Sequence, residues 1–271
     1  MSLHLKLNAR AVFGRAYPRI IGSYREPSWM FFEIFLPVLA IAAYVFIYEA
    51  LKAPPQFVGF VILGGAMSAF WLNVLWSMAA QLYWEKEIGN LQLYMMAPMS
   101  RMSLLGGMAL GGMWLSSTRA VATVVIGVLL FKGLDPIFPL MLVPIFLVTL
   151  VALYGMGMMF ASLYLMWGRE AWHMASLMEE PIYFVSGFYF PVRALGFWVA
   201  LSASIIPITM GLDAMRQLLF PKATTWGLLP VEVELAVLVV LSVVFLFLAK
   251  ISLAKMENLA RKKGGLTLRW Q

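Results

Sequence analysis

Six long apolar runs dominate this sequence, at about residues 29–48, 57–80, 104–131, 137–167, 171–190 and 235–254. A helix needs roughly 20 mostly apolar residues to cross the hydrocarbon core of a bilayer. Because 62% of the 271 residues are hydrophobic and only 12% are charged, no segment is polar enough to form a soluble enzyme domain. We therefore predict an all-α polytopic membrane protein, a single transmembrane domain of residues 1–271 with six transmembrane helices.

Residues 1–27 have an amphipathic pattern instead of a continuous apolar run. Six apolar residues fall on one narrow helical arc, and the basic side chains lie outside it: Leu5, Ala9, Val12, Phe13, Ala16 and Ile20. A helix lying in the membrane interface has this pattern, although a solvated helix can share it. We favour the interfacial helix because a span follows immediately, and we expect Pro18 to kink or break it.

Residues 192–230 allow two topologies, a seventh span or a re-entrant pair of short helices. The apolar stretch at 194–206 is too short to cross a bilayer. Basic residues collect on the cytoplasmic side of membranes, and both ends of this chain are basic, so the number of crossings should be even. Six spans place fourteen basic residues inside and five outside. We predict cytoplasmic termini, a cytoplasmic tail at 255–271 and a re-entrant hairpin on the outer side between spans five and six.

Residues that bind metals or nucleotides are absent or scattered. The chain has no cysteine, and His4 and His173 lie far apart, which is typical of isolated histidines and not of a metal site. No G-x-x-x-x-G-K-[ST] phosphate loop is present. The glycine pairs at 64–65, 106–107 and 111–112 lie in apolar spans, where small residues let helices pack closely. We predict no cofactor in this chain, and we attribute its net charge of +7 to membrane topology and not to nucleic-acid binding.

The segment 84–101, between spans two and three, is too polar for a span and too apolar for a simple solvated loop. Leu91, Met95, Met96 and Met99 give a short helix an adaptable apolar face, and Pro98 should end that helix. Two interpretations remain open. The helix either rests on lipid headgroups or docks a cytoplasmic partner.

Two motifs resemble the permeases of type-2 (ABC-2) ATP-binding cassette transporters. The first resembles the segment after the second span in that family and consists of Glu85, Gly89, Leu91, Pro98 and Ser100. The second is similar to the pattern at the outer end of the fifth span: Ser186, Gly187, Phe188, Phe190 and Pro191, followed by Pro207 and Arg216. With the six spans and the basic N-terminal helix, the resemblance extends over nearly the whole chain.

The resemblance implies a division of labour between subunits. Such permeases form homodimers or heterodimers in the plasma (inner) membrane of bacteria or archaea, and each protomer binds a separate ATPase subunit that holds ATP and Mg. The coupling helix at 84–101 would dock into that subunit through Glu85, Glu87, Gly89, Leu91, Met95, Met96, Pro98, Met99 and Arg101. The hairpin and the second motif would cap the outer side of the path. Most members export drugs, lipids, antibiotics or lipid-linked glycans.

Three charged residues lie deep inside the predicted spans. Arg119 follows Leu104 by 15 residues, about 22 Å along a helix, while Glu179 and Glu180 lie well inside span five. Charges in a bilayer are costly and mark either an internal pair or a functional path. A structural pair of Arg119 with one of these glutamates is our first hypothesis, with a polar lining of the path or proton coupling as alternatives. We expect Glu33 near the cytoplasmic interface.

The leading functional hypothesis is the membrane subunit of an ATP-driven exporter, without a catalytic site of its own. The runner-up is a stand-alone secondary transporter or channel, which an internal inverted repeat would favour, and none is visible. An intramembrane enzyme is the third hypothesis. The chain has no H-E-x-x-H motif. The side chains of the adjacent Glu179 and Glu180 point about 100° apart on a helix and so do not form an acidic dyad.

Overall fold

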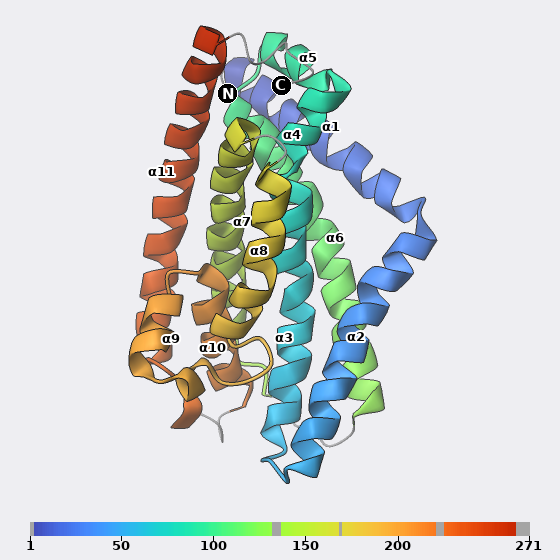
Figure 1. Ribbon diagram of the computed structural model, residues 1–271, viewed down its shortest axis with the longest axis vertical. Helices are drawn as coiled ribbons and strands as arrows, with labels where there is room; N and C mark the ends of the chain where they lie inside the picture. The colour runs from blue at the N-terminus through green and yellow to red at the C-terminus, as the bar shows by residue number, and fades with distance from the viewer. Residues whose placement is uncertain (1–2, 132–136, 168–169, 221–224, 264–271) are drawn as a thin grey trace.

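The computed structural model describes residues 3–131, 137–167, 170–220 and 225–263, and every regular element in these ranges is a helix. The helices are α1 (Leu3–Tyr24), α2 (Pro27–Ala50), α3 (Gln56–Leu72), the π-helix η1 (Asn73–Ala79), α4 (Gln81–Ile88), α5 (Asn90–Met96), α6 (Arg101–Leu130), α7 (Leu142–Trp167), α8 (Glu170–Val185), the 3-10 turn η2 (Val192–Leu195), α9 (Phe197–Ala203), α10 (Pro207–Leu219) and α11 (Val231–Lys263). The long helices run side by side as a bundle (Figure 1).

Five helices of the described residues are long and apolar enough to cross a bilayer: α2, the continuous rod from α3 to α4, α6, α7 and α11. A sixth arises if α9 and α10, between which the chain bends by 116°, are taken as one broken span. This supports the prediction of an all-α polytopic membrane protein. Helix α8 has only 16 residues, fewer than the fifth span predicted at 171–190. The helix ends early because Gly187 adopts φ +63° and turns the chain.

Different helices lie at the two ends of the bundle (Figure 1). Helices α1, α4 and α5 and the end of α11 lie at one end, and the α2–α3 turn and the α9–α10 pair lie towards the other. The predicted coupling segment therefore shares an end with both terminal helices, as the basic residues led us to expect.

Helix α1 differs from its prediction in two respects. It continues through Pro18 without a break, because Pro18 and Gly14 face outward and the Gly14 carbonyl that loses its partner lies at the surface. Its packing face also differs from the predicted arc, since Phe13 is 70% exposed whereas Arg15 and Arg19 lie against the bundle. Periodicity alone could not show that two arginines have polar partners inside.

Glycines allow these helices to approach closely, which confirms their predicted packing role. A Cβ on Gly107 of α6 would lie 2.6 Å from the Val12 carbonyl oxygen of α1. A Cβ on Gly64 of α3 would lie 1.5 Å from the Phe188 carbonyl oxygen, and one on Gly112 would lie 2.2 Å from Asn73 Oδ1. Any side chain at these positions would push neighbouring segments apart.

Candidate functional site

The segment between the second and third spans forms two short helices, and not the single helix predicted at 84–101. Gly89 separates α4 from α5 with φ 88°, a left-handed conformation that only glycine adopts readily. Helix α4 is the end of a continuous 33-residue rod from Gln56 to Ile88 that includes α3 and the π-helix η1. The segment is therefore directly connected to a membrane-spanning helix.

Of the nine residues of this segment that were expected to contact a partner, the structure buries two inside the protein, Glu85 and Leu91. Glu85 is 4% exposed and Leu91 is 1% exposed, so the expectation that they present side chains to an ATPase is wrong. Leu91 packs between Leu82 and the start of α6. Glu87 is half-buried, Pro98 is exposed, and Met99 and Arg101 line a small cleft beside Leu253 and Met256. The Met95 side chain lies outside the described residues.

Glu85 belongs to a polar junction that joins α1, α4 and α5. Its carboxylate forms an ion pair with Arg15 and accepts hydrogen bonds from Gln81 Nε2 (2.9 Å) and Asn90 Nδ2 (3.2 Å). The Arg15 guanidinium also donates to the Tyr94 hydroxyl at 2.8 Å and lies 5.2 Å from the centre of that ring. Sequence reasoning missed Arg15 and Tyr94, because their contacts join residues 70 or more positions apart.

A second arginine of α1 continues this polar contact toward the bundle. Arg19 donates to the hydroxyl of Ser77 on the π-helix. The pKa of Arg19 is lowered to about 10, mainly by burial and also by the neighbouring Arg15 and Arg119, while Tyr154 opposes the shift. Since this value is well above 7, Arg19 remains cationic at neutral pH.

The outward side of α4 and α5 carries exposed apolar side chains. Ile88 is 63% exposed, Leu93 is 62% exposed and Met96 is 75% exposed. We call these three residues the docking face. Only Met96 was among the predicted contacts, and Ile88 and Leu93 were missed because the segment was expected to be one helix with Leu91 on its outer side. Exposed apolar clusters of this kind mark interaction surfaces.

At the opposite end of the bundle, Arg216 brings the two parts of the second motif together. This side chain of α10 is 2% exposed and donates to the carbonyl oxygens of Gly187 (2.7 Å), Phe188 (2.7 Å), Phe190 (3.0 Å) and Phe60 (3.0 Å). Pro191 and Pro207 are also buried, and Pro207 begins α10. We call Arg216 and its four carbonyl partners the outer junction.

The intramembrane charges are paired differently from our first hypothesis. Arg119 of α6 forms its ion pair with Glu33 of α2, with Nη2 and Oε2 2.5 Å apart. The predicted pair with Glu179 or Glu180 is wrong, and Glu33 is the carboxylate that balances Arg119. Sequence position placed Glu33 near an interface, but it could not show which helix faces α2.

The Arg119–Glu33 pair gives a direct test of this correction. Arg119→Met or Glu33→Gln alone leaves the partner without its counter-charge and should lower the free energy of unfolding by about 3–5 kcal/mol. The double variant should lose less than the sum, because neither charge then remains unpaired. Unfolding in mixed detergent micelles measures this cycle, with Arg119→Met combined with Glu179→Gln as the control. Additive losses for Arg119 and Glu33, or coupling of Arg119 to Glu179, would contradict the assignment.

Glu179 and Glu180 line a cavity of about 510 Å³ formed by α2, α3, α8 and the residues that follow α8. Glu179 accepts a hydrogen bond from Trp76 Nε1 at 2.7 Å, and Glu180 is exposed. Tyr44 and Tyr189 stack with ring centres 4.3 Å apart, and Tyr183 is nearly parallel to Tyr189 at 6.3 Å. Two interpretations of these glutamates remain, a polar lining of the substrate path and proton coupling. This geometry favours the polar lining.

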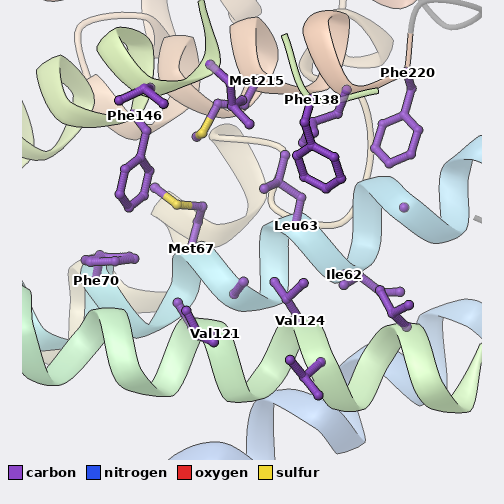
Figure 2. Close-up of a pocket in the computed structure, with 18 of the residues that line it drawn as sticks. Ile62, Leu63, Met67, Phe70, Val121, Val124, Phe138, Phe146, Met215 and Phe220 are labelled. Carbon is purple, nitrogen blue, oxygen red and sulfur yellow. The ribbon is translucent and has the colours of Figure 1, made fainter. Parts of the chain in front are cut away.

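A second cavity, of about 410 Å³, is purely apolar (Figure 2). Ile62, Leu63 and Met67 of α3 and Val124 of α6 point into it, and Phe220 lies at one end. Binding sites for small molecules combine apolar walls with a few polar groups that fix orientation. This groove has no such group, so the cavity with the two glutamates is the better candidate site.

Comparison with known proteins gives one family. A family model described as ABC-2 type transporter matches residues 18–220, which is more than half of the chain. The matched range includes the docking face, the outer junction and the residues that line both cavities. No curated protein and no solved structure matches the chain.

Proposed function

The chain belongs to the ABC-2 type transporter family, and on that premise we propose that it is the permease subunit of an ATP-binding cassette exporter. It moves an amphipathic substrate out of the cytoplasm with energy from a separate ATPase subunit, which holds the ATP and Mg. The docking face is the observation that carries the proposal. Ile88, Leu93 and Met96 are exposed at the end of the bundle that also holds both terminal helices (Figure 1).

The docking face is mechanically connected to the helices behind it. The Arg15–Glu85 pair and the Tyr94 hydrogen bond join α4 and α5 to α1, and α1 packs tightly on the glycines of α6. A force on α4 or α5 therefore reaches α1 and α6 as well as α3. An isolated interfacial helix would have no need for this buried ion pair.

The same rod also reaches the cavity wall. The π-helix η1 lies between α3 and α4, and its Trp76 donates to Glu179 of α8. Short π-helical segments within α-helices are frequent at functional sites. We propose that movement of α4 rotates or shifts η1 and so changes the cavity beside Glu179.

The working unit is a dimer of permease protomers, identical or related, each with one ATPase subunit. Glu180 supports this because a carboxylate exposed at the depth of the spans is costly against lipid. A second protomer covering α8, or a water-filled path between protomers, removes that cost. The complex lies in the plasma (inner) membrane of a bacterium or archaeon, with both termini cytoplasmic and the α9–α10 pair, as a re-entrant hairpin, on the outer side.

Purification of the full-length chain from its own membranes tests this function. We expect a co-purifying polypeptide that has a phosphate loop and binds 8-azido-ATP, and an assembled complex that hydrolyses ATP in the presence of Mg. The purified chain alone should neither hydrolyse ATP nor be labelled. A chain that generates flux by itself in vesicles under an ion gradient, with no effect of ATP, would overturn the exporter proposal and support the secondary transporter or channel.

A further inference from the structure

The cavity that holds Glu179 and Glu180 has an acidic and aromatic lining. Its described walls include two carboxylates, three tyrosines and no basic residue. We propose that this cavity binds amphipathic organic cations, which makes lipophilic amines or quaternary cations the substrate class of the exporter. That these cations are the transported substrate rests on the proposed function. That they bind in this cavity rests on the cavity itself.

The two carboxylates lack the internal counter-charge that other charged residues packed inside the bundle have. Arg119 is paired with Glu33, and Arg15 is paired with Glu85. Among the ion pairs of the described residues, none involves Glu179 or Glu180. In the part of the chain that the structure describes, Glu179 accepts a hydrogen bond from the neutral donor Trp76 Nε1, at 2.7 Å. A buried or membrane-embedded carboxylate favours a positive partner, and a bound cation can take that place here.

The aromatic walls favour an organic cation over a bare metal ion. Tyr44, Tyr189 and Tyr183 form a nearly parallel series along the cavity, with ring centres 4.3 Å and 6.3 Å apart. Aromatic faces attract ammonium and guanidinium groups, and they also pack against apolar bodies. Tyr48 fixes this series by donating to the Tyr189 carbonyl oxygen at 2.8 Å.

The size of the cavity fits the same class of ligand. A volume of about 510 Å³ lies within the range of roughly 300–1,000 Å³ that is typical of sites for drug-sized molecules. Leu36, Leu72 and Phe184 provide the apolar part of the wall. The apolar groove in Figure 2 has a comparable volume but no charged lining, so it gives no charge selectivity.

Two probes of the same shape and opposite charge test the proposal. Tetraphenylphosphonium and tetraphenylborate are titrated against the full-length chain in uncharged lipid nanodiscs, with empty nanodiscs subtracted. We expect tetraphenylphosphonium to bind at least tenfold more tightly. Glu179→Gln combined with Glu180→Gln should lower its affinity at least tenfold without weakening tetraphenylborate. Glu49→Gln, on the exposed end of α2, is the matched control and should leave both affinities unchanged.

Tyr44→Leu provides a second variant if the double substitution fails to fold. It keeps both carboxylates and should weaken the phosphonium at least threefold while having no effect on the borate. Equal binding of both probes, or cation binding that survives the double substitution, would overturn the proposal and leave the glutamates as proton carriers or contacts to a second protomer. An ATP-driven complex without charge preference overturns this inference alone. If the chain binds the cation but neither co-purifies with an ATPase subunit nor transports in response to ATP, only the exporter proposal is overturned.

Discussion

We expect that replacing Leu93 by Asp separates the permease from the proposed ATPase subunit while leaving the permease folded. Leu93 is 62% exposed, so a carboxylate there remains in water and does not disturb the core. Losing an apolar anchor at the centre of an interface typically costs about 2 kcal/mol or more, which is about 30-fold in affinity. Export and ATP hydrolysis by the assembled complex should fall accordingly. Titration of the co-purified ATPase subunit with permease in detergent measures the affinity.

Two neighbours on α5 provide matched controls for this variant. Leu91→Asp makes the same change two positions away, but Leu91 is 1% exposed, so it should destabilise the permease itself by several kcal/mol. Gln92→Asp adds the same charge at an exposed polar position and should leave assembly within about threefold of wild type, since surface changes have small effects. If Leu93→Asp assembles with normal affinity, α4 and α5 form an interfacial helix pair on lipid headgroups, and the exporter proposal loses its main support.

The spans could be predicted from the sequence because hydrophobic length is a local property. A run such as 104–131 contains its own signal, and α6 begins and ends within three residues of it. The glycine pairs could also be interpreted correctly, because small residues in apolar spans have few roles other than close packing. The end of the fifth span was missed because it depends on one left-handed residue, Gly187.

The partners of charged residues could not be predicted, because each pairing depends on which helices become neighbours. The sequence placed two carboxylates at the depth of Arg119, Glu179 and Glu180, whereas the packing of α2 against α6 selects Glu33. Arg15 was placed on the solvent side by periodicity, although Glu85 and Tyr94 make the inner side favourable for it. Gly89 was expected to be one of the docking contacts, and its left-handed turn divides the segment in two. The two errors at the arginines have one cause, since a hydrophobic pattern does not distinguish a polar group that has a partner from one that does not.

The outer junction leads to the largest expected loss of stability. Arg216 is fully desolvated, and its charge is met by the four carbonyl oxygens of Gly187, Phe188, Phe190 and Phe60. The guanidinium carbon also lies 5.0 Å from the centre of the Phe60 ring. These contacts join α10 to α3 and to the turn after α8. Because a Cβ on Gly64 would overlap the Phe188 carbonyl, this turn lies directly on α3 and has no room to shift.

Arg216→Met should lower the free energy of unfolding by at least about 4 kcal/mol, because four buried carbonyl groups lose their donor and each unpaired group costs about 1–3 kcal/mol. Arg216→Lys should recover less than half of this loss, since an ammonium on a shorter stem lacks the planar fork that reaches two segments at once. Arg193→Met is the matched control. Arg193 also donates to two carbonyl oxygens, those of Thr225 and Gly227, but it is exposed, so its loss should cost below about 1 kcal/mol. Unfolding in mixed micelles compares the three variants. Similar stabilities for Arg216→Met and Arg193→Met would mean that the hairpin is held by its apolar contacts alone, and that Arg216 faces water in the assembled transporter.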